Sequence, residues 1–298
     1  MHPVLSDPLS PPMNATVAED ALRPEVLRIA TYNIHKGVQG LWRMSRLEIG
    51  NLGLAIEQLD ADIVCLQEVR KMNLREQLRF ADWPSIPQAD FLAPEGYEAV
   101  YHTNAVTRHG EHGNALLSRW PVVHSQQRDI SDHRLEQRGI LHVELNVGGS
   151  PVHVLVVHLG LIHISRIRQV EMIHEFVRDE VPADAAVVVA GDFNDWGEQT
   201  SALLRTSGFR EFEQGRFFTY PSVLPVVQLD RIFVRGLTPR GMFVPRGRIW
   251  RRMSDHLPLL AEFSFDATSP APLAAPRTRT PSRKKPAQSL KKRLRRPW

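Results

Sequence analysis

Short apolar runs, many of them rich in β-branched residues, recur along the chain between polar, glycine and proline positions. Several alternate apolar and polar residues, as in ILHVELNV at residues 140–147, which is typical of a strand with one covered face. The runs predict strands at Leu27–Ile34, Ile63–Gln67, Ala115–Leu117, Gly139–Val147, Val152–His158, Val187–Ala190, Leu229–Val234 and Leu259–Phe265.

Helical periodicity is clearest at residues 165–180, where four apolar residues spaced three or four positions apart share one face. A second helix is expected at residues 52–59. Many strands with few long helices predict an α+β fold, a four-layered α/β/β/α sandwich of two packed, mainly antiparallel sheets flanked by helices. Strict alternation of strand and helix is absent, so a doubly wound sheet is the weaker alternative.

The apolar pattern stops near both ends of the chain. Residues 1–24 are rich in proline and small residues, so we expect disorder there. This segment has neither the basic nor the apolar region of a secretory signal, so none is expected. Residues 267–298 hold few large apolar side chains, which predicts a basic disordered tail. One folded domain is therefore expected at residues 25–266. No apolar run reaches the roughly 20 residues of a membrane helix.

Charge is divided unevenly along the chain. The formal net charge is +4, but ten Lys or Arg residues and no acid lie within residues 277–298. Residues 1–276 then hold 27 bases against 33 acids, a net charge of −6. Enzymes that bind duplex DNA normally present a basic groove to its phosphates, so this total argues against such a substrate. A local basic strip is still compatible with it, and RKMNLREQLR at residues 70–79 is the candidate.

The single cysteine, Cys65, lies within the apolar run ADIVCLQEV. One cysteine excludes a disulfide within the chain and a cluster of thiolates around a metal. It also fits a reducing compartment.

Six of the predicted strands carry a polar, chemically useful side chain at an end or an edge. In chain order these residues are Asn33, Glu68, His158, Asp192 with Asn194, Asp230, and Asp255 with His256. Residues two positions apart on a strand point to the same side, so Asp192 and Asn194 aim at one place. Each residue alone has an ordinary explanation as a turn or solvated residue, but six such strand ends together predict a shared site.

The motifs that hold these residues are TYNIHKG, LQEV, HGNALLSRWP, HLGL, GDFND, LDRIFV and SDHLPL. In this order they resemble the endonuclease/exonuclease/phosphatase superfamily, which includes deoxyribonuclease I and neutral sphingomyelinases. The resemblance spans about residues 27 to 265. The stretches NIHKG, EHGNALLSRWP and PVVQLDRIFV are similar to a bacterial branch often encoded beside cardiolipin synthases. The resemblance implies that residues 25–266 form a catalytic domain that hydrolyses a phosphate ester with a divalent metal.

The resemblance implies a metal site of hard oxygen donors. Glu68 is expected to be the principal ligand, with Asn33 supporting the ion or the phosphate and Asp255 as a further ligand. Mg²⁺ suits such donors because it binds one or two carboxylates and takes phosphate oxygen directly. Mn²⁺ is the alternative ion.

The catalytic roles are also implied by the resemblance. Asp192 and Asn194 are expected to hold the attacking water and the scissile phosphate. His256 pairs with Asp230, which leaves open whether the imidazole stabilises charge or accepts a proton. His158 is a second imidazole that donates to phosphate or protonates the leaving group. Deoxyribonuclease I and the sphingomyelinases also have histidine at this strand end, whereas abasic-site endonucleases usually have asparagine. The chain therefore resembles the first group more closely at this position.

Two further residues have evenly weighted interpretations. Asn114 matches a family position that approaches the phosphate, but it is equally well a turn residue before a strand. Arg166 is a candidate phosphate clamp because a guanidinium binds phosphate through two parallel hydrogen bonds. An arginine at the start of a helix more commonly faces solvent. His35 stands where many relatives place an acid near the metal.

The leading hypothesis is a Mg²⁺-dependent phosphodiesterase acting on a lipid headgroup, a small molecule or a nucleic acid. A DNA or RNA endonuclease of the same superfamily is the alternative. A non-catalytic protein that binds nucleic acid or membranes is disfavoured because Glu68, Asp192 and His256 are all present. We expect a cytoplasmic monomer; the alternative location is peripheral attachment at the inner face of the membrane. The basic tail is expected to bind an anionic membrane or nucleic acid.

Overall fold

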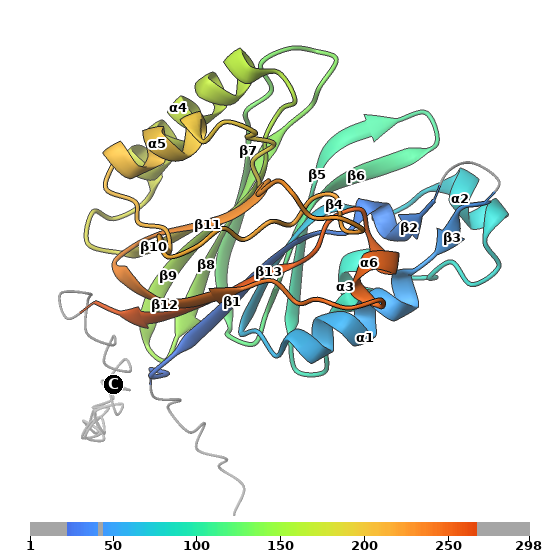
Figure 1. Ribbon diagram of the computed structural model, residues 1–298, viewed down its shortest axis with the longest axis horizontal. Coiled ribbons are helices and arrows are strands. Elements are labelled where there is room, and N and C mark those ends of the chain that lie inside the picture. The colour runs from blue at the N-terminus through green and yellow to red at the C-terminus, as the bar shows by residue number, and fades with distance from the viewer. Residues whose placement is uncertain (1–22, 41–43, 267–298) are drawn as a thin grey trace, which may run out of the picture.

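The computed structural model describes residues 23–40 and 44–266 of the chain. Disorder was expected for residues 1–24 and for the tail at 267–298, and all of these residues except 23 and 24 lie outside the described part of the chain. Two large sheets pack face to face, and helices cover their outer faces (Figure 1).

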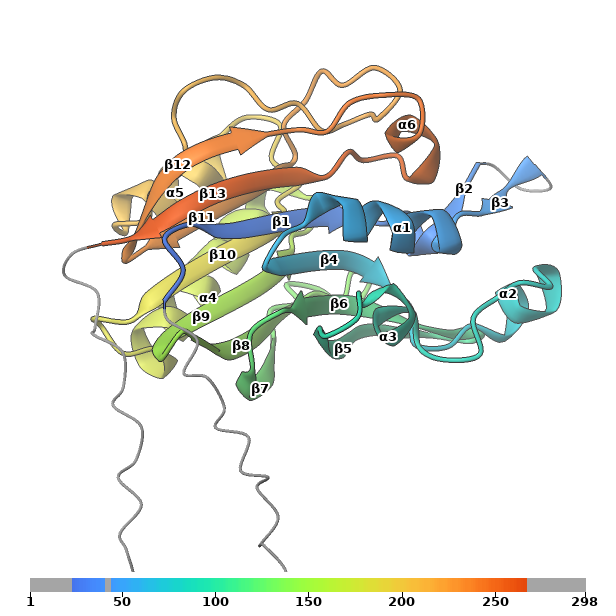
Figure 2. The same ribbon diagram turned by 90° about the horizontal axis from the view of Figure 1, so that it is seen from below.

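One sheet has six strands in the order β12-β13-β1-β4-β6-β5. β1 (Leu27–Asn33) runs parallel to β4 (Ile63–Val69), as their arrowheads show in Figure 2, and the other neighbouring pairs are antiparallel. The remaining strands of this sheet are β5 (Glu98–Thr107), β6 (Gly110–Ser118), β12 (Leu237–Phe243) and β13 (Leu259–Phe265).

The other large sheet has five strands in the order β11-β10-β9-β8-β7. β9 (Ser150–His158) and β10 (Ala186–Asp192) are parallel, and the other pairs are antiparallel. Its remaining strands are β7 (Val122–Asp129), β8 (Gly139–Val147) and β11 (Asp230–Arg235). A small ribbon pairs β2 (Val38–Gln39) with β3 (Arg46–Leu47).

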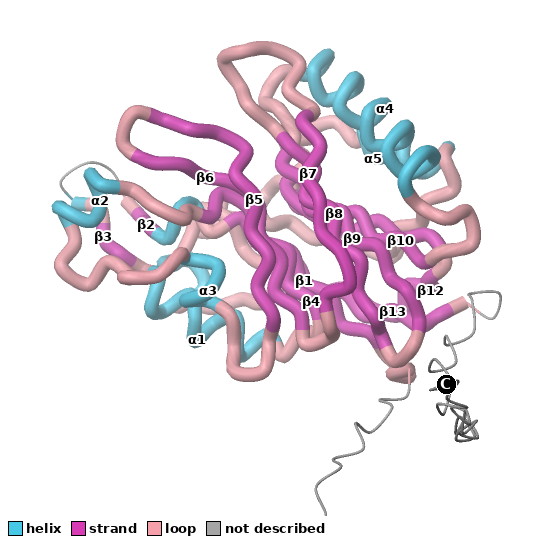
Figure 3. The backbone as a smooth tube through the Cα atoms, turned by 180° about the vertical axis from the view of Figure 1, so that it is seen from behind, coloured by secondary structure: helices cyan, strands magenta, loops and turns pink. Residues whose placement is uncertain are grey.

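Three buried apolar layers hold the four structural layers together. The central layer lies between the two sheets and contains Cys65 and Val156, one from each sheet. A second layer joins the six-stranded sheet to α1 and α3, and a third joins the five-stranded sheet to α4 and α5, so strands lie between two groups of helices in Figure 3. The helices are α1 (Ile49–Leu59), α2 (Leu74–Arg79), α3 (Gln88–Leu92), α4 (His163–Glu180), α5 (Gln199–Thr206) and α6 (Trp250–Met253). The predicted α/β/β/α sandwich is confirmed.

Each strand predicted from an apolar run is present, but three strands of the two large sheets, β5, β7 and β12, were not predicted. All three lie at sheet edges. An edge strand has one unpaired side and less buried surface, so it tolerates the polar residues of VVHSQQRD in β7 and the proline of LTPRGMF in β12. Their sequences therefore lack the apolar runs that mark central strands.

Polar residues gather at one end of the sandwich. β1 ends at Asn33 in one sheet and β10 ends at Asp192 in the other, and a hydrogen bond of 3.1 Å joins these two side chains. The predicted convergence of strand ends is thus found in the fold. Among the described residues, no helix has both the length and the apolar character to cross a bilayer.

A buried histidine pair lies away from that end. His142 of β8 places Nε2 3.0 Å from Nδ1 of His153 of β9, and its ring packs edge-on against Phe176 of α4. Burial, with the neighbouring His153, lowers the pKa of His142 to about 4. An unfolded chain takes up a proton near pH 6.5, so protonation favours unfolding between these two values.

We predict that this group makes the free energy of unfolding fall by about 3 kcal/mol as the pH drops from 7 to 4. His142→Gln cannot titrate, so its unfolding free energy should vary less over that range. Urea unfolding at a series of pH values measures this slope, and His163→Gln, an exposed histidine at the start of α4, is the control. Equal slopes for His142→Gln and the wild type would contradict the prediction.

Candidate active site

Three polar residues form a row across the five-stranded sheet at its polar end. Backbone register places Asp192 of β10 opposite His158 of β9 on one side and Asp230 of β11 on the other. All three side chains are buried, and Asp230 is fully inaccessible. Strand pairing alone therefore brings together an imidazole and two carboxylates that are far apart in sequence.

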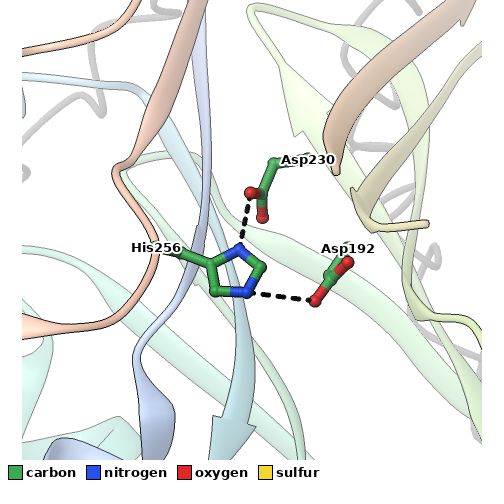
Figure 4. Close-up of side chains that lie close together, drawn as sticks. All are labelled: Asp192, Asp230 and His256. Atoms are coloured by element: carbon green, nitrogen blue, oxygen red, sulfur yellow. Dashed lines mark hydrogen bonds and ion pairs between the residues drawn. The ribbon is translucent and has the colours of Figure 1, made fainter. Parts of the chain in front are cut away.

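His256 completes this group from the other sheet. It precedes β13, and its Nδ1 lies 2.8 Å from Oδ2 of Asp230, while its Nε2 lies 3.6 Å from Oδ2 of Asp192 (Figure 4). The side chain of His256 is 6 % exposed. The expected His256–Asp230 pair is thus present, with a second carboxylate on the far side of the ring.

Oδ2 of Asp192 is the centre of the arrangement. It accepts a hydrogen bond from Nδ2 of Asn33 at 3.1 Å and lies 3.6 Å from Nε2 of His158. The other oxygen, Oδ1, accepts from the backbone N–H of Asn194 at 2.9 Å, and the Asn194 side chain donates to the carbonyl of Leu159. The GDFND stretch therefore folds back on itself to fix the carboxylate.

A second group of charges lies nearer to solvent. Oε2 of Glu68 is 2.8 Å from Nζ of Lys36 and 4.0 Å from Nδ1 of His35. The same His35 nitrogen is 3.3 Å from Oδ2 of Asp255. The side chains of Glu68 and Asp255 are 17 % and 35 % exposed, although Oε2 of Glu68 is itself buried.

Asn33 and Ser254 connect the two groups. Oδ1 of Asn33 accepts from the backbone N–H of His35, while its Nδ2 donates to Asp192. The Ser254 hydroxyl donates to the Asn33 carbonyl and accepts from the backbone N–H of His256. The residues predicted from six separate strand ends therefore belong to one continuous network.

The backbone is strained at this end of the molecule. His35, Lys36, Glu68 and Asn194 all have positive φ, between 45° and 62°. Non-glycine residues rarely adopt this conformation, and its cost is tolerated mainly where function requires it. Gly191 precedes Asp192 with φ of 154°, and a Cβ there would lie 1.8 Å from the Val157 carbonyl oxygen. Only glycine allows β9 and β10 to approach this closely beside the site.

The two imidazoles near Asp192 differ in charge. Burial lowers the pKa of His158 to about 4, and the Arg138 guanidinium acts in the same direction, so this ring is neutral at pH 7. Burial also opposes the charge on His256, but the carboxylates of Asp230 and Asp192 outweigh it and raise its pKa to about 10. Such a pair of groups with opposite shifts is suited to acid–base chemistry.

The carboxylates at the mouth of the site are ionised. Burial would raise the pKa of Glu68, but the Lys36 ammonium holds it well below its ordinary value. Burial likewise opposes ionisation of Asp255, whose pKa is lowered by its hydrogen bond with His35. Negative charge is therefore available there at neutral pH.

The donors fit a hard divalent cation. The network offers carboxylate oxygens and the amide oxygen of Asn33, and no thiolate, which are the ligands that Mg²⁺ or Mn²⁺ prefers. Ligand atoms of Asp192, Asp230 and His256 also lie within 4.8 Å of one another. Nδ1 of His256 is hydrogen-bonded to Asp230, so this trio is better suited to orienting an imidazole. Oδ1 of Asp230 is buried with no hydrogen-bond partner among the described residues.

Two of the predicted site residues have structural contacts instead. Nδ2 of Asn114 donates to the carbonyls of Gly139 and Val156, so both of its N–H groups are used to join the two sheets. Arg166 is buried, and its Nη1 donates to the carbonyls of Gly160 and Leu161. It therefore holds the turn after His158. A contact of either residue with phosphate remains a prediction.

Sequence reasoning missed two residues of the site. Lys36 pairs with Glu68, and its place beside His35 in TYNIHKG was the available signal. The Tyr220 ring packs 5.0 Å from the His256 ring. Tyr220 follows no apolar run or motif, so its role depends on how residues 209–229 fold over the end of β13.

The sequence motifs and the site agree with a comparison against protein families. A model described as the endonuclease/exonuclease/phosphatase family matches residues 30–256. The chain belongs to this family. The matched span runs from β1 to His256 and so includes the whole network. Enzymes of this family are generally hydrolytic and generally use divalent metals. The coarse prediction, that the chain belongs to a family of hydrolytic phosphoesterases and nucleases, is therefore confirmed.

The relatives extend over most of the chain. The uncharacterized protein YbhP of Escherichia coli K12 is 38 % identical over 243 residues, covering 79 % of this chain and 95 % of YbhP. A UPF0294 protein of Yersinia enterocolitica is 29 % identical and covers 80 % of this chain and 84 % of its own length.

Solved structures show the same fold at low identity. The mannosyl-6-phosphatase Bt3783 of Bacteroides thetaiotaomicron has a TM-score of 0.62 at 18 % identity, covering 80 % of this chain and all of that chain. Zebrafish (D. rerio) TDP2 complexed with a single-strand DNA product has a TM-score of 0.59 at 17 % identity, covering 81 % of this chain and 100 % of that chain. These similarities support the deoxyribonuclease I-like fold.

We predict that Asp230 is needed to keep His256 charged. Asp230→Asn removes the closest carboxylate while preserving shape, so burial should lower the pKa of His256 from about 10 toward neutral pH. Titration of the ring nitrogens by ¹⁵N NMR, without added metal, measures this. An unchanged pKa in Asp230→Asn would assign the effect to Asp192 instead.

We also predict that Arg166 acts on stability more than on substrate affinity. Arg166→Met keeps the aliphatic stem but loses the bonds to two carbonyls, which should cost about 1–3 kcal/mol of unfolding free energy. Denaturant unfolding and KM for a small phosphodiester are the two measurements. A raised KM with unchanged stability would instead favour the phosphate clamp.

Proposed function

We propose that the protein is a Mg²⁺-dependent phosphodiesterase, with Mn²⁺ as an alternative ion. The observation that carries the proposal is the network around Oδ2 of Asp192, in which a neutral and a cationic imidazole lie at 3.6 Å from the same carboxylate oxygen. Membership of a hydrolytic family supports the reaction class. A non-catalytic binding protein would not need this arrangement.

Glu68, Asp255 and Asn33 are the residues that would hold the metal. The side chains of Glu68 and Asp255 are partly exposed, whereas Asn33 is buried and links His35 to Asp192. Lys36 already balances the charge of Glu68. The bound ion would neutralise phosphate charge and act as a Lewis acid.

The chain's own residues supply the remaining chemistry. His256, held as a cation by Asp230 and Asp192, places positive charge where a phosphoryl oxygen becomes more negative during attack. Asp192 is fixed by Asn33 and Asn194 and is the carboxylate that accepts a proton from the attacking water. His158 is neutral at pH 7 and its Nε2 lies 3.6 Å from Oδ2 of Asp192, so it can take up the proton that Asp192 accepts from water and pass it to the leaving oxygen.

A basic hollow next to the site offers room for further substrate phosphates. Its volume is about 180 Å³, and His35, Lys36, Arg70 and Arg79 are among its lining residues. Glu76 lies between the two arginines at 3.8 and 3.9 Å, which limits the net positive charge. The hollow includes part of the basic strip anticipated at residues 70–79.

A nuclease activity is the second candidate. The basic hollow favours it, and TDP2, which shares the fold, has been solved with a single-strand DNA product. The net charge of −6 over residues 1–276 argues against a broad duplex-binding face. We propose the cytoplasm as the compartment and a monomer as the active form.

We predict Mg²⁺-dependent hydrolysis of bis-p-nitrophenyl phosphate by the full chain. Glu68→Gln and His256→Ala should each lower kcat/KM by about 10²- to 10⁴-fold, because one removes a ligand and the other a positioned catalytic group. Chelation of the metal should abolish turnover, and added Mg²⁺ or Mn²⁺ should restore it. Release of p-nitrophenol is the measurement.

Matched controls come from exposed residues. Asp90→Asn on α3 and His124→Ala on β7 make the same chemical changes far from the network and should keep wild-type rates. Supercoiled plasmid and a single-strand oligonucleotide assayed in parallel distinguish the nuclease. Full activity in Glu68→Gln and His256→Ala would refute the proposed site.

A further inference from the structure

Exposed apolar side chains are concentrated at the end of the molecule that holds the site. Most large apolar residues exposed in the described part of the chain lie in segments that join strands at this end. Only a few, such as Leu54 of α1 and Val123 at the start of β7, lie elsewhere. Single exposed apolar residues are common on soluble proteins, but a concentrated group signals an interaction surface.

The segment directly after His158 carries one part of this group. Leu161, Ile162 and Ile164 are 70 %, 49 % and 53 % exposed, and Leu135 of the β7–β8 loop is 96 % exposed. The backbone N–H of Leu161 donates to the Glu136 carboxylate at 3.1 Å, which holds the two loops together. Four aliphatic side chains therefore face solvent beside the catalytic row.

A second part lies beside His256. Trp196 follows the Asp192 strand and is 66 % exposed, with its ring 6.3 Å from Tyr220, which in turn packs on His256. Val223 and Leu224, in the same segment as Tyr220, are 62 % and 69 % exposed. The site is thus bordered by apolar residues on both sides.

The third part is α2. Leu74 and Leu78, one turn apart, are 53 % and 91 % exposed, and they share a hollow with Arg75, Arg79 and His109. α2, the β5–β6 hairpin and the β7–β8 loop all project at the end to which β1 and β4 run (Figure 1). We call Leu78, Leu135, Leu161, Ile164, Trp196 and Leu224 the apolar rim.

Basic residues accompany the apolar rim. The connection between β12 and β13 that leads to His256 carries Arg246, Arg248, Arg251 and Arg252, all exposed. Among the described residues, no ion pair involves these four arginines. Exposed arginines without an ion-pair partner, next to exposed aliphatic side chains, are typical of a surface that binds an anionic lipid interface.

We propose that the apolar rim and these arginines dock the protein on an anionic membrane, with the catalytic site facing a lipid that carries a phosphodiester. The inference rests on the proposed function, since it names where that function's substrate lies. The aliphatic tips enter the interface and the arginines contact lipid phosphates. The buried Asp192 network then lies at the level of the lipid headgroups.

The aliphatic character of the rim favours lipid over nucleic acid. A nucleic-acid surface relies on Lys and Arg contacts to phosphate and on stacked aromatic rings. Here Leu78, Leu135 and Leu161 are the most exposed tips, and leucine side chains neither stack on bases nor bind phosphate. They are stabilised by transfer from water into an acyl layer.

The test is co-flotation of the full-length protein with phosphatidylcholine vesicles that contain phosphatidylglycerol. The variant Leu135→Ser/Leu161→Ser removes two tips and should lower vesicle partition at least about tenfold. Arg248→Gln/Arg251→Gln should also weaken it and make the remaining binding less sensitive to salt. The basic tail is present in every protein compared, so its contribution is constant.

The matched control is Leu54→Ser/Val123→Ser, which removes two exposed apolar residues, at 62 % and 60 %, away from the site and should float like the wild type. Turnover of bis-p-nitrophenyl phosphate, which needs no membrane, should be the same in wild type, rim variants and controls. Turnover of a lipid phosphodiester in the vesicles should fall only in the rim variants.

The outcomes separate the two proposals. Equal flotation of wild type and Leu135→Ser/Leu161→Ser overturns the membrane surface while leaving the phosphodiesterase intact. If the rim variants lose binding to a single-strand oligonucleotide and keep vesicle binding, the surface is a nucleic-acid site and the proposal is wrong. A third outcome is that the wild type floats with the vesicles, the rim variants do not, and neither phosphodiester is hydrolysed. This outcome would refute the proposed function and retain the docking surface.

Discussion

The arrangement of the polar end depends on the carboxylate of Asp192, which is buried at the end of a central strand. A buried charge is costly unless other groups bond to it or carry opposite charge. Here Asn33 of the other sheet donates to it, the backbone N–H of Asn194 donates to its second oxygen, and His158 and His256 lie beside it. The two sheets therefore meet in one orientation at this end, and the strained backbone of Asn194 is tolerated there.

Charge and exposure change in a graded way from this carboxylate outward. The Asp192 group is nearly inaccessible, Glu68 and Asp255 are partly exposed, and the arginines before His256 are on the surface. Buried groups are suited to orienting protons, because their pKa values respond strongly to neighbours. The partly exposed carboxylates can admit an ion, and the outer charges can attract an anionic substrate. Under the proposed function, this order would let an acidic domain act on phosphate esters.

Sequence patterns predicted elements well wherever burial dominates. Central strands such as β1 and β10, and the helix α4, bury one face or both, so their apolar periodicity is strong. The edge strand β7 buries little of its surface, so its sequence is polar and no apolar run predicted it. The same contrast holds in the site. Strand-end motifs located Asp192 and His256, whereas Tyr220 lies in an irregular segment whose path depends on long-range packing.

The sequence by itself determined the family, the sandwich and the set of strand ends that bear carboxylates, amides and imidazoles, because these depend on local periodicity and on motif order. Only the tertiary structure decided which of these groups touch. It joined Asn114 and Arg166 to backbone carbonyls, paired Lys36 with Glu68, and surrounded the site with exposed leucines. Hydrogen-bond partners and solvent exposure depend on packing between segments that are distant in the sequence, so a local pattern of residues cannot predict them.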